Sequence, residues 1–551
     1  MSERTYRLNP RDRTGWFLGL GGAQVVVLGT ALVTAAVAVH YGAPLLLGAL
    51  VLAVAGTLAL GRLGGRPLVE WAPHALRWAA QRRARTWFAP LHTLSGPAPA
   101  TPPLPPPLDA QVVAAVPGPG GAEMAVVADR DAGTLAATLR VAGRQFALVE
   151  RADQDALLAL WGDALGAFCR EAAAVVEVRW SEWAAPAGME DTHAYLAEHA
   201  LDDPTDPAVA SYRQLLRSAA PVATRHEVLV TVVVSMRRVR LEARHDGDRS
   251  AAATEVLAEE VRRLARRLEA AGLSVSAPLT VAELARALRV RLDPTTLAAL
   301  DRRARSLGER AGVVAPAGAG PLCATAGRRW WEVDGSLHRT FALTEWPRAE
   351  VGPTWMADLL LYAGAVRTIA VSYTPVPPRV SQRAIARQAA RLEADVDQRR
   401  RSGFRVGAHH RRASAAVEER EEELVAGFAE LAYAGVVDVC APDPESLERA
   451  CADVVQAAAA CGIELRSLDR RHDQGAAACL PLASGLAPRL VAGCRRPSLR
   501  HRGRIPAGGA APPRPCARPG CACPATGPPR PSWPASTPSR PAKAWAGGAS
   551  T

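Results

Sequence analysis

The chain has 551 residues, of which 49% are hydrophobic and 22% charged, as expected for about two to four ordinary folded units. The net charge of +12 is concentrated at the end of the chain, because residues 485–551 contain ten arginines, one lysine and no acidic residue. The folded part therefore carries no broad basic field for nucleic acid, and it lacks the lysine that a P-loop or a Schiff base needs, since Lys543 is the only lysine.

Two long uncharged stretches near the N-terminus predict a pair of membrane-spanning helices. They run from Trp16 to Val39 and from Ala43 to Leu60, and both are long enough to cross a bilayer, which takes roughly 20 helical residues. Arginines precede the first stretch and follow the second, which by the positive-inside rule puts both ends in the cytoplasm. We therefore predict a cytoplasmic N-terminus at 1–15 and a transmembrane hairpin at 16–60 in the cell membrane. A cleaved signal peptide and two buried core helices are the alternatives.

The next two segments are predicted to connect this hairpin to a folded domain. Residues 61–90 are basic and amphipathic, and Val69 to Phe88 interleaves Trp and Arg, as in a helix that lies on an anionic membrane surface. A solvated basic connector is the alternative. Residues 91–109 include the Pro-rich run from Gly96 to Leu108, which predicts a semi-rigid spacer.

Residues 110–325 alternate strand and helix patterns and are predicted to form a first cytoplasmic α/β lobe. Helices are expected along 157–168 and 257–268, with two short helices around the turn at 202–207. The expected strands are 125–128, 135–141, 175–180 and 226–235. The Val-rich sequence of the last strand predicts burial on both faces.

Residues 326–486 are predicted to form a second cytoplasmic α/β lobe. Asp334-Gly335 favours a tight hairpin turn, a strand follows at 366–373, and Ile385, Leu392 and Val396 mark one face of a long helix. Residues 436–440, 445–460 and 463–468 predict a β-α-β unit. Both lobes show the same order of elements, which indicates a degenerate duplication, and their overall class is α/β, with α+β lobes.

The last segment changes character. Residues 487–551 are rich in Pro, Ala, Gly and Arg without apolar periodicity, which predicts a disordered basic tail. The abrupt change after Leu482 would also fit a frameshifted terminus. The scattered cysteines of the folded part, including Cys440, Cys451 and Cys461, are predicted to be reduced and buried.

No catalytic, cofactor-binding or metal site is predicted, because the chain contains no P-loop, HExxH or paired CxxC motif, and no GxGxxG after a strand. Several polar clusters have simpler structural interpretations. These are a turn at Asp129 and Asp131, a solvated loop at His409-His410, a polar linker at Asp469, His472 and Asp473, and the solvated start of a helix at Glu418–Glu423. The spacing of the tail cysteines Cys516, Cys521 and Cys523 fits no common zinc pattern.

The layout resembles an actinobacterial two-helix membrane-protein family that is encoded with conjugation and secretion elements. The resemblance is carried by the Arg-bearing start, the apolar hairpin, the juxtamembrane sequence GRPLVEWAP and a domain that runs to LPLASGL. Residues from about Ala110 to Leu486 are also similar to the N-terminal, non-motor region of the type IV secretion assembly ATPase, but no motor follows here.

The resemblance implies a non-enzymatic scaffold without a cofactor. Such a subunit would sit in an oligomeric complex in the cytoplasmic membrane with other secretion or conjugation subunits and would dock a separate P-loop ATPase. The alternatives are an E-like component of a type VII secretion membrane complex, a membrane-tethered enzyme with an unrecognised site, and a nucleic-acid tether acting through weak, non-specific contacts of the tail.

Overall fold

A computed structural model gives the arrangement of most of the chain. It describes residue 6 and residues 22–63, 66–69, 85–90, 102–143, 146, 148–187, 189–199, 206–220, 223–242, 249–308, 312–401, 403, 405 and 407–483. The tail expected at 487–551 and its cysteines lie outside the described residues.

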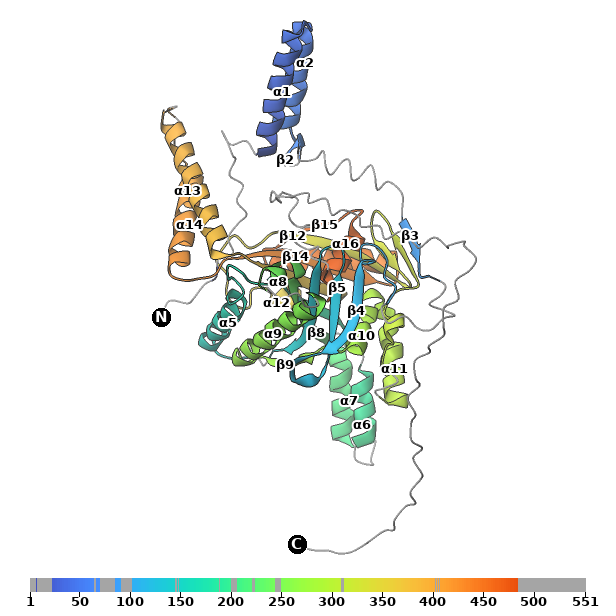
Figure 1. Ribbon diagram of the computed structural model, residues 1–551. Helices are drawn as coiled ribbons and strands as arrows, with labels where there is room; N and C mark the ends of the chain where they lie inside the picture. Colours follow the sequence, from blue (N-terminus) through green and yellow to red (C-terminus); the bar gives the residue numbers. More distant parts are fainter. Residues whose placement is uncertain are drawn as a thin grey trace, which may run out of the picture. The chain divides into compact units, whose positions relative to one another are not determined.

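Two apolar helices, α1 (Gly22–His40) and α2 (Leu45–Leu60), lie side by side (Figure 1). They pack against each other through small residues. In each helix the buried positions follow the spacing i, i+7, i+11. They are Gln24, Ala31 and Ala35 on α1, and Gly48, Ala55 and Ala59 on α2. Small side chains allow two helix backbones to approach closely. The amide of Gln24 adds a hydrogen bond to the carbonyl oxygen of Ala59.

Most of the helix expected over 69–88 lies outside the described residues, and only its end can be compared. Strands β1 (Arg62–Leu63) and β2 (Arg66–Pro67) pair with each other, and β3 (Arg85–Phe88) pairs antiparallel with β10 (Cys323–Ala326) at the edge of the main sheet. The helix prediction is therefore wrong at residues 85–88. The physical reason is strand-like alternation, because Trp87 packs against the core while Phe88 is exposed.

The rest of the described chain alternates helices and strands, which confirms the mixed helix-and-sheet class. The helices are α5 (Arg151–Gly166), α6 (Glu190–His199), α7 (Pro207–Ala219), α8 (Met236–Glu242), α9 (Arg249–Ala270), α10 (Val281–Leu292), α11 (Leu297–Leu307), α12 (Ala357–Leu360), α13 (Pro378–Arg401), α14 (Ala408–Val425), α15 (Pro444–Ala460) and α16 (His472–Cys479). The remaining strands are β4 (Gln111–Pro117), β5 (Glu123–Asp129), β6 (Thr134–Ala142), β7 (Val175–Pro186), β8 (Thr224–Ser235), β9 (Ser274–Pro278), β11 (Trp331–Val333), β12 (Ser336–Glu345), β13 (Val366–Pro375), β14 (Leu431–Ala441) and β15 (Glu464–Ser467).

Within the described residues, the strands from β3 to β15 form one 13-stranded sheet, so strands of both expected lobes share a single sheet. Its order is β3-β10-β11-β12-β14-β13-β7-β8-β6-β5-β4, with β15 beside β12 and β9 beside β6. Neighbouring strands pair antiparallel throughout. The expected hairpin at Asp334-Gly335 is confirmed, because β11 and β12 pair around it and Asp334 has a φ of 47°.

The two halves of this sheet have the same topology. In the first half the chain order β6-α5-β7-β8-α9-β9 gives the spatial order β9-β6-β8-β7. In the second half β12-α12-β13-β14-α15-β15 gives β15-β12-β14-β13. Both correspond to the split β-α-β arrangement of ferredoxin-like folds. The halves join where β7 pairs with β13, and each carries an inserted helical hairpin, α6–α7 or α13–α14. The predicted repetition of element order is confirmed.

Both faces of the sheet are buried, as β8 illustrates. Val230, Val232 and Val234 face a core that includes α5 and α9, whereas Leu229 and Val233 pack into a second core with α10 and α16. The predicted burial of this strand on both faces is confirmed. We call the side covered by α10, α16 and residues 480–483 the α10–α16 face.

Part of the expected Pro-rich spacer belongs to the folded domain. Leu104 and Leu108 are 5% and 0% exposed and lie in the core on the α10–α16 face. The expectation of a spacer is therefore wrong for residues 102–109. The physical reason is that this run places leucines between its prolines, and burying these side chains stabilises a fixed position.

Replacing Gly320 by alanine tests this packing. A Cβ at Gly320 would lie 2.0 Å from the carbonyl oxygen of Pro103, whereas a Cβ at Gly318 would meet its nearest atom at an ordinary 3.9 Å. We expect Gly320→Ala to lower the free energy of unfolding by about 1–3 kcal/mol, measured by urea denaturation, while Gly318→Ala is near neutral. Equal stability of both variants would contradict the docking of residues 102–108.

Candidate functional site

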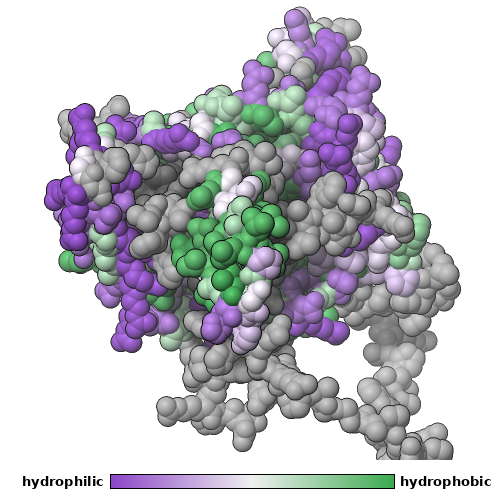
Figure 2. All heavy atoms as spheres, turned by 90° about the horizontal axis from the view of Figure 1, so that it is seen from above, coloured by the Kyte–Doolittle hydropathy of each residue, from purple (hydrophilic) through white to green (hydrophobic). Residues whose placement is uncertain are grey.

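The N-terminal helix pair presents an apolar surface. α1 is long and apolar enough to cross a bilayer, and only 17% of its apolar window is buried, unlike a core helix of a soluble protein. α2 is also apolar but has only 16 residues. Figure 2, seen from above, shows a hydrophobic group in green. The exposed apolar side chains of the pair include Val26, Leu32, Val33, Leu45, Leu46 and Leu50, all more than half exposed.

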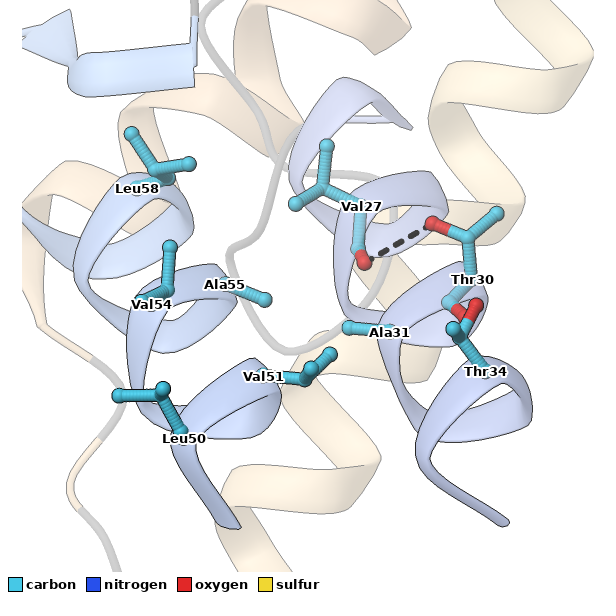
Figure 3. Close-up of a pocket in the computed structure, with 9 residues that line it drawn as sticks. All are labelled: Val27, Thr30, Ala31, Thr34, Leu50, Val51, Val54, Ala55 and Leu58. Carbon is cyan, nitrogen blue, oxygen red and sulfur yellow. Dashed lines mark hydrogen bonds between the residues drawn. The ribbon is translucent and has the colours of Figure 1, made fainter. Parts of the chain in front are cut away.

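A shallow groove of ≈ 410 Å³ runs between α1 and α2 (Figure 3). Its walls are aliphatic apart from two threonines. The single hydroxyl proton of Thr30 is shared between the carbonyl oxygens of Val26 and Val27, and Thr34 donates to that of Thr30. Because the hydroxyls are satisfied inside the helix, the groove is suited to hydrocarbon rather than to a polar ligand.

The α10–α16 face of the sheet contains buried charges. Arg179 on β7 is 0% exposed, and its guanidinium donates to Glu177 at 2.6 and 3.0 Å and to the carbonyl oxygens of Leu480 and Leu482 at 2.8 and 2.9 Å. Ser372 on β13 donates to the same Glu177 oxygen at 2.7 Å. This cluster ties together both halves of the sheet and the segment after α16.

A second carboxylate, partly buried, lies between two arginines. Glu227 on β8 accepts hydrogen bonds from Arg140 on β6 at 3.0 Å and from Arg291 on α10 at 2.8 Å. Burial by itself raises the pKa of Glu227, but the two guanidinium groups outweigh burial and hold this pKa below its usual value. The carboxylate stays ionised and fixes α10 on the sheet.

His338, Asp438 and Cys440 come together on β12 and β14 in an arrangement that is superficially similar to a nucleophile triad. His338 Nδ1 lies 2.9 Å from Asp438, and Nε2 lies 2.9 Å from the carbonyl oxygen of Leu292 and 3.8 Å from Cys440 Sγ. Burial lowers the pKa of His338, but Cys440 and Asp438 raise it well above its ordinary value. Since both ring nitrogens face acceptors, the imidazolium form fits, and its Nε2 proton is bound to a backbone oxygen.

The cluster expected as a polar linker at Asp469, His472 and Asp473 is different in the structure. His472 and Asp473 are buried and begin α16, whereas the Asp469 side chain is 63% exposed. The linker prediction is wrong because α16 places its first residues against β12, where His472 Nδ1 accepts from the Thr340 amide at 3.1 Å. Burial lowers the pKa of His472 to about 4 and raises that of Asp473.

Two other interpretations of polar clusters need correction. His409-His410 lies in α14 rather than in a loop, and His410 is bound to Asp395 of α13. Glu418–Glu423 lies in the C-terminal half of α14, not at its start, because the helix already begins at Ala408.

The interpretation of Asp129 as a turn residue is confirmed. Its carboxylate accepts from the Ala132 amide and from Gln111, both at 2.7 Å, and so closes the turn between β5 and β6. Cys440, Cys451 and Cys461 are buried and unpaired, as predicted. Burial raises the pKa of Cys451 to about 12.

The buried charges of β7 are not among the residues predicted from the sequence. The signal was present in the sequence VVEVRWSEW, because Glu177 and Arg179 are two residues apart and therefore point to the same face of a strand. Among the described residues, no group of three or more His, Cys, Asp or Glu side chains could hold a metal ion. No protein-family model matches this chain, and no curated protein matches its sequence.

Proposed function

We propose that this chain is a membrane-anchored structural subunit of a type IV-like conjugation or protein-secretion apparatus, and that it docks a separate ATPase. The observation that carries the proposal is α1, an apolar helix that is long enough for a bilayer and leaves most of its surface outside the protein core. A helix of this kind is stable where lipid covers its Val and Leu side chains.

In this proposal α2 crosses the same membrane, and both termini lie in the cytoplasm. The small-residue contact and the bond from Gln24 to Ala59 support the pairing of the helices. With 16 residues α2 rises about 24 Å, so local thinning of the bilayer would accommodate it. The arginines on both sides of the pair favour this orientation.

The folded domain supports a scaffold role. Its strongest constellations, around Arg179, Glu227 and His338, use their polar atoms to hold the sheet and the α10–α16 face together. The two inserted hairpins, α6–α7 and α13–α14, extend the surface that neighbouring subunits can contact. An ATPase and other membrane subunits are the partners of this proposal.

The anchor is tested by placing an arginine on the outward side of α1. Val33 is 63% exposed, so Val33→Arg costs little in water but opposes insertion into a bilayer. We expect the wild-type chain to resist alkaline carbonate extraction and Val33→Arg to shift substantially to the supernatant. Leu307→Arg on α11, which is 72% exposed, should remain in the membrane. Release of the wild-type chain by carbonate would contradict the anchor.

The scaffold role is tested by purifying the tagged full-length chain in mild detergent and identifying co-purified proteins by mass spectrometry. The proposal expects a protein with Walker motifs together with other membrane subunits. A partner set without any nucleotide-hydrolysing protein, found while the chain remains in the membrane, would reject the docking role and leave the anchor intact.

A further inference from the structure

The two inserted hairpins carry opposite charge where their helices meet. Around the α13–α14 turn, residues 398–417 contain six arginines and two histidines but no Asp or Glu. Around the α6–α7 turn, residues 198–206 contain Glu198, Asp202, Asp203 and Asp206 but no Arg or Lys. We call these segments the basic tip and the acidic tip.

Strand direction separates the two hairpins. α6–α7 follows the end of β7, and α13–α14 follows the end of β13. Because β7 and β13 pair antiparallel, their C-terminal ends lie at opposite ends of the sheet. The hairpins therefore start from opposite ends, one leading to the basic tip and the other to the acidic tip.

The α13–α14 hairpin is built to hold its tip away from the sheet. α13 has 24 residues, which correspond to about 36 Å of helix. Ile385, Leu392 and Val417 form an apolar cluster between the two helices. Near the tip Asp395 binds both Arg399 and His410 and so ties α13 to α14.

The outermost arginines face solvent. Arg400, Arg401, Arg405 and Arg412 are exposed. Guanidinium groups bind phosphate oxygens in a bidentate manner, and clustered arginines are attracted to anionic lipid headgroups.

We propose that the basic tip binds the anionic headgroups of the membrane that holds α1. The inference rests on the membrane anchor of the proposed function, because a tethered domain meets the lipid surface at high effective concentration. The same tether favours a lipid surface over nucleic acid as the partner, because it keeps the basic tip within reach of the headgroups. The acidic tip is repelled by the same surface, so the pair of tips orients the domain.

Limited trypsin digestion of the full-length chain in vesicles tests this contact, since trypsin cleaves after arginine. Cleavage after Arg405 is compared in vesicles of phosphatidylcholine alone and in vesicles that also contain phosphatidylglycerol. We expect about tenfold slower cleavage with the anionic lipid. Cleavage after Arg213 on α7 is the internal reference and should not depend on lipid charge.

Charge reversal provides the matched variants. Arg411→Glu with Arg412→Glu should abolish the lipid-dependent protection of Arg405, because repulsion replaces attraction at the tip. Arg302→Glu with Arg303→Glu, an equal change at exposed positions on α11, should leave the protection unchanged. The thermal unfolding temperature of both variants is measured to show that they remain folded.

Three outcomes would overturn the proposal. Cleavage after Arg405 could be equal in both lipids, or added duplex DNA could protect the tip where anionic lipid does not. Arg405 could also be protected in neutral vesicles, and the double variant Asp202→Asn with Asp203→Asn could remove this protection. The basic tip would then bind the acidic tip of a second copy rather than lipid. Stable reconstitution into neutral vesicles reports the anchor separately, so failure of the tip contact leaves the proposed anchor standing.

Discussion

Replacement of Arg179 by methionine is expected to lower the free energy of unfolding by about 3–5 kcal/mol, because it breaks a buried ion pair from one side. Methionine fills a similar volume, but it leaves Glu177 charged, 4% exposed and without its guanidinium partner. The carbonyl oxygens of Leu480 and Leu482 lose their donors as well. Urea denaturation of the detergent-solubilised full-length chain, followed by tryptophan fluorescence, measures the loss.

Two comparisons isolate the ion pair in this experiment. Adding Glu177→Gln to Arg179→Met should recover part of the lost stability, because the uncompensated charge is removed. Arg348→Met, at a side chain that is 78% exposed, should change stability by less than about 0.5 kcal/mol. If Arg179→Met were as mild as Arg348→Met, the central cluster would not hold the two halves together.

The sequence was sufficient to predict most elements of the sheet. The Val-rich run of β8 and the Asp334-Gly335 turn have strong local signals, and the structure has a strand and a hairpin there. The repeated order of elements was also visible. The continuous antiparallel sheet was not, because the pairing of β7 with β13 joins residues that are almost two hundred positions apart, and no local pattern encodes it.

The errors occur where local composition and tertiary contacts disagree. The run from Gly96 to Leu108 has the composition of a spacer, but Leu104 and Leu108 are buried in a core that residues far along the chain complete. Likewise, Trp87 lies in a strand only because β10 provides an edge with which to pair. Propensity describes the isolated segment, and the tertiary partner decides its conformation.

The buried polar clusters could be anticipated only in part. The spacing of Glu177 and Arg179 shows a shared face, but the carbonyl oxygens that complete the Arg179 site come from Leu480 and Leu482, about three hundred residues later. His338 and Asp438 are one hundred residues apart and meet only because β12 pairs with β14. Register, which the sequence does not display, assembles these groups.

The two buried histidines of β12 and α16 should make stability depend on pH in opposite directions. The pKa of His472 is lowered to about 4, so between pH 4 and the ordinary value of about 6.5 the unfolded chain binds a proton that the folded chain excludes. His472 therefore contributes stability on the order of 3 kcal/mol above pH 6.5, which is lost as the pH falls toward 4.

His338 has the opposite sign. Its pKa is raised well above the ordinary value, so above about pH 6.5 the folded chain holds a proton that the unfolded chain has released. The stability that the His338–Asp438 pair contributes is complete below pH 6.5 and is lost as the pH rises through the folded pKa.

Unfolding temperatures of the wild type, His338→Gln and His472→Gln across this pH range measure both effects. Relative to wild type, His472→Gln should remove the fall in stability on acidification, and His338→Gln should remove the fall on the alkaline side. His199→Gln, at an exposed position on α6, should retain the fall in stability on both the acidic and the alkaline side. If the unfolding temperature of His338→Gln still fell at alkaline pH as in the wild type, His338 would be neutral in the folded chain. The contact between its Nε2 and the Leu292 oxygen would then require the neutral Nε2–H tautomer, without an ion pair to Asp438.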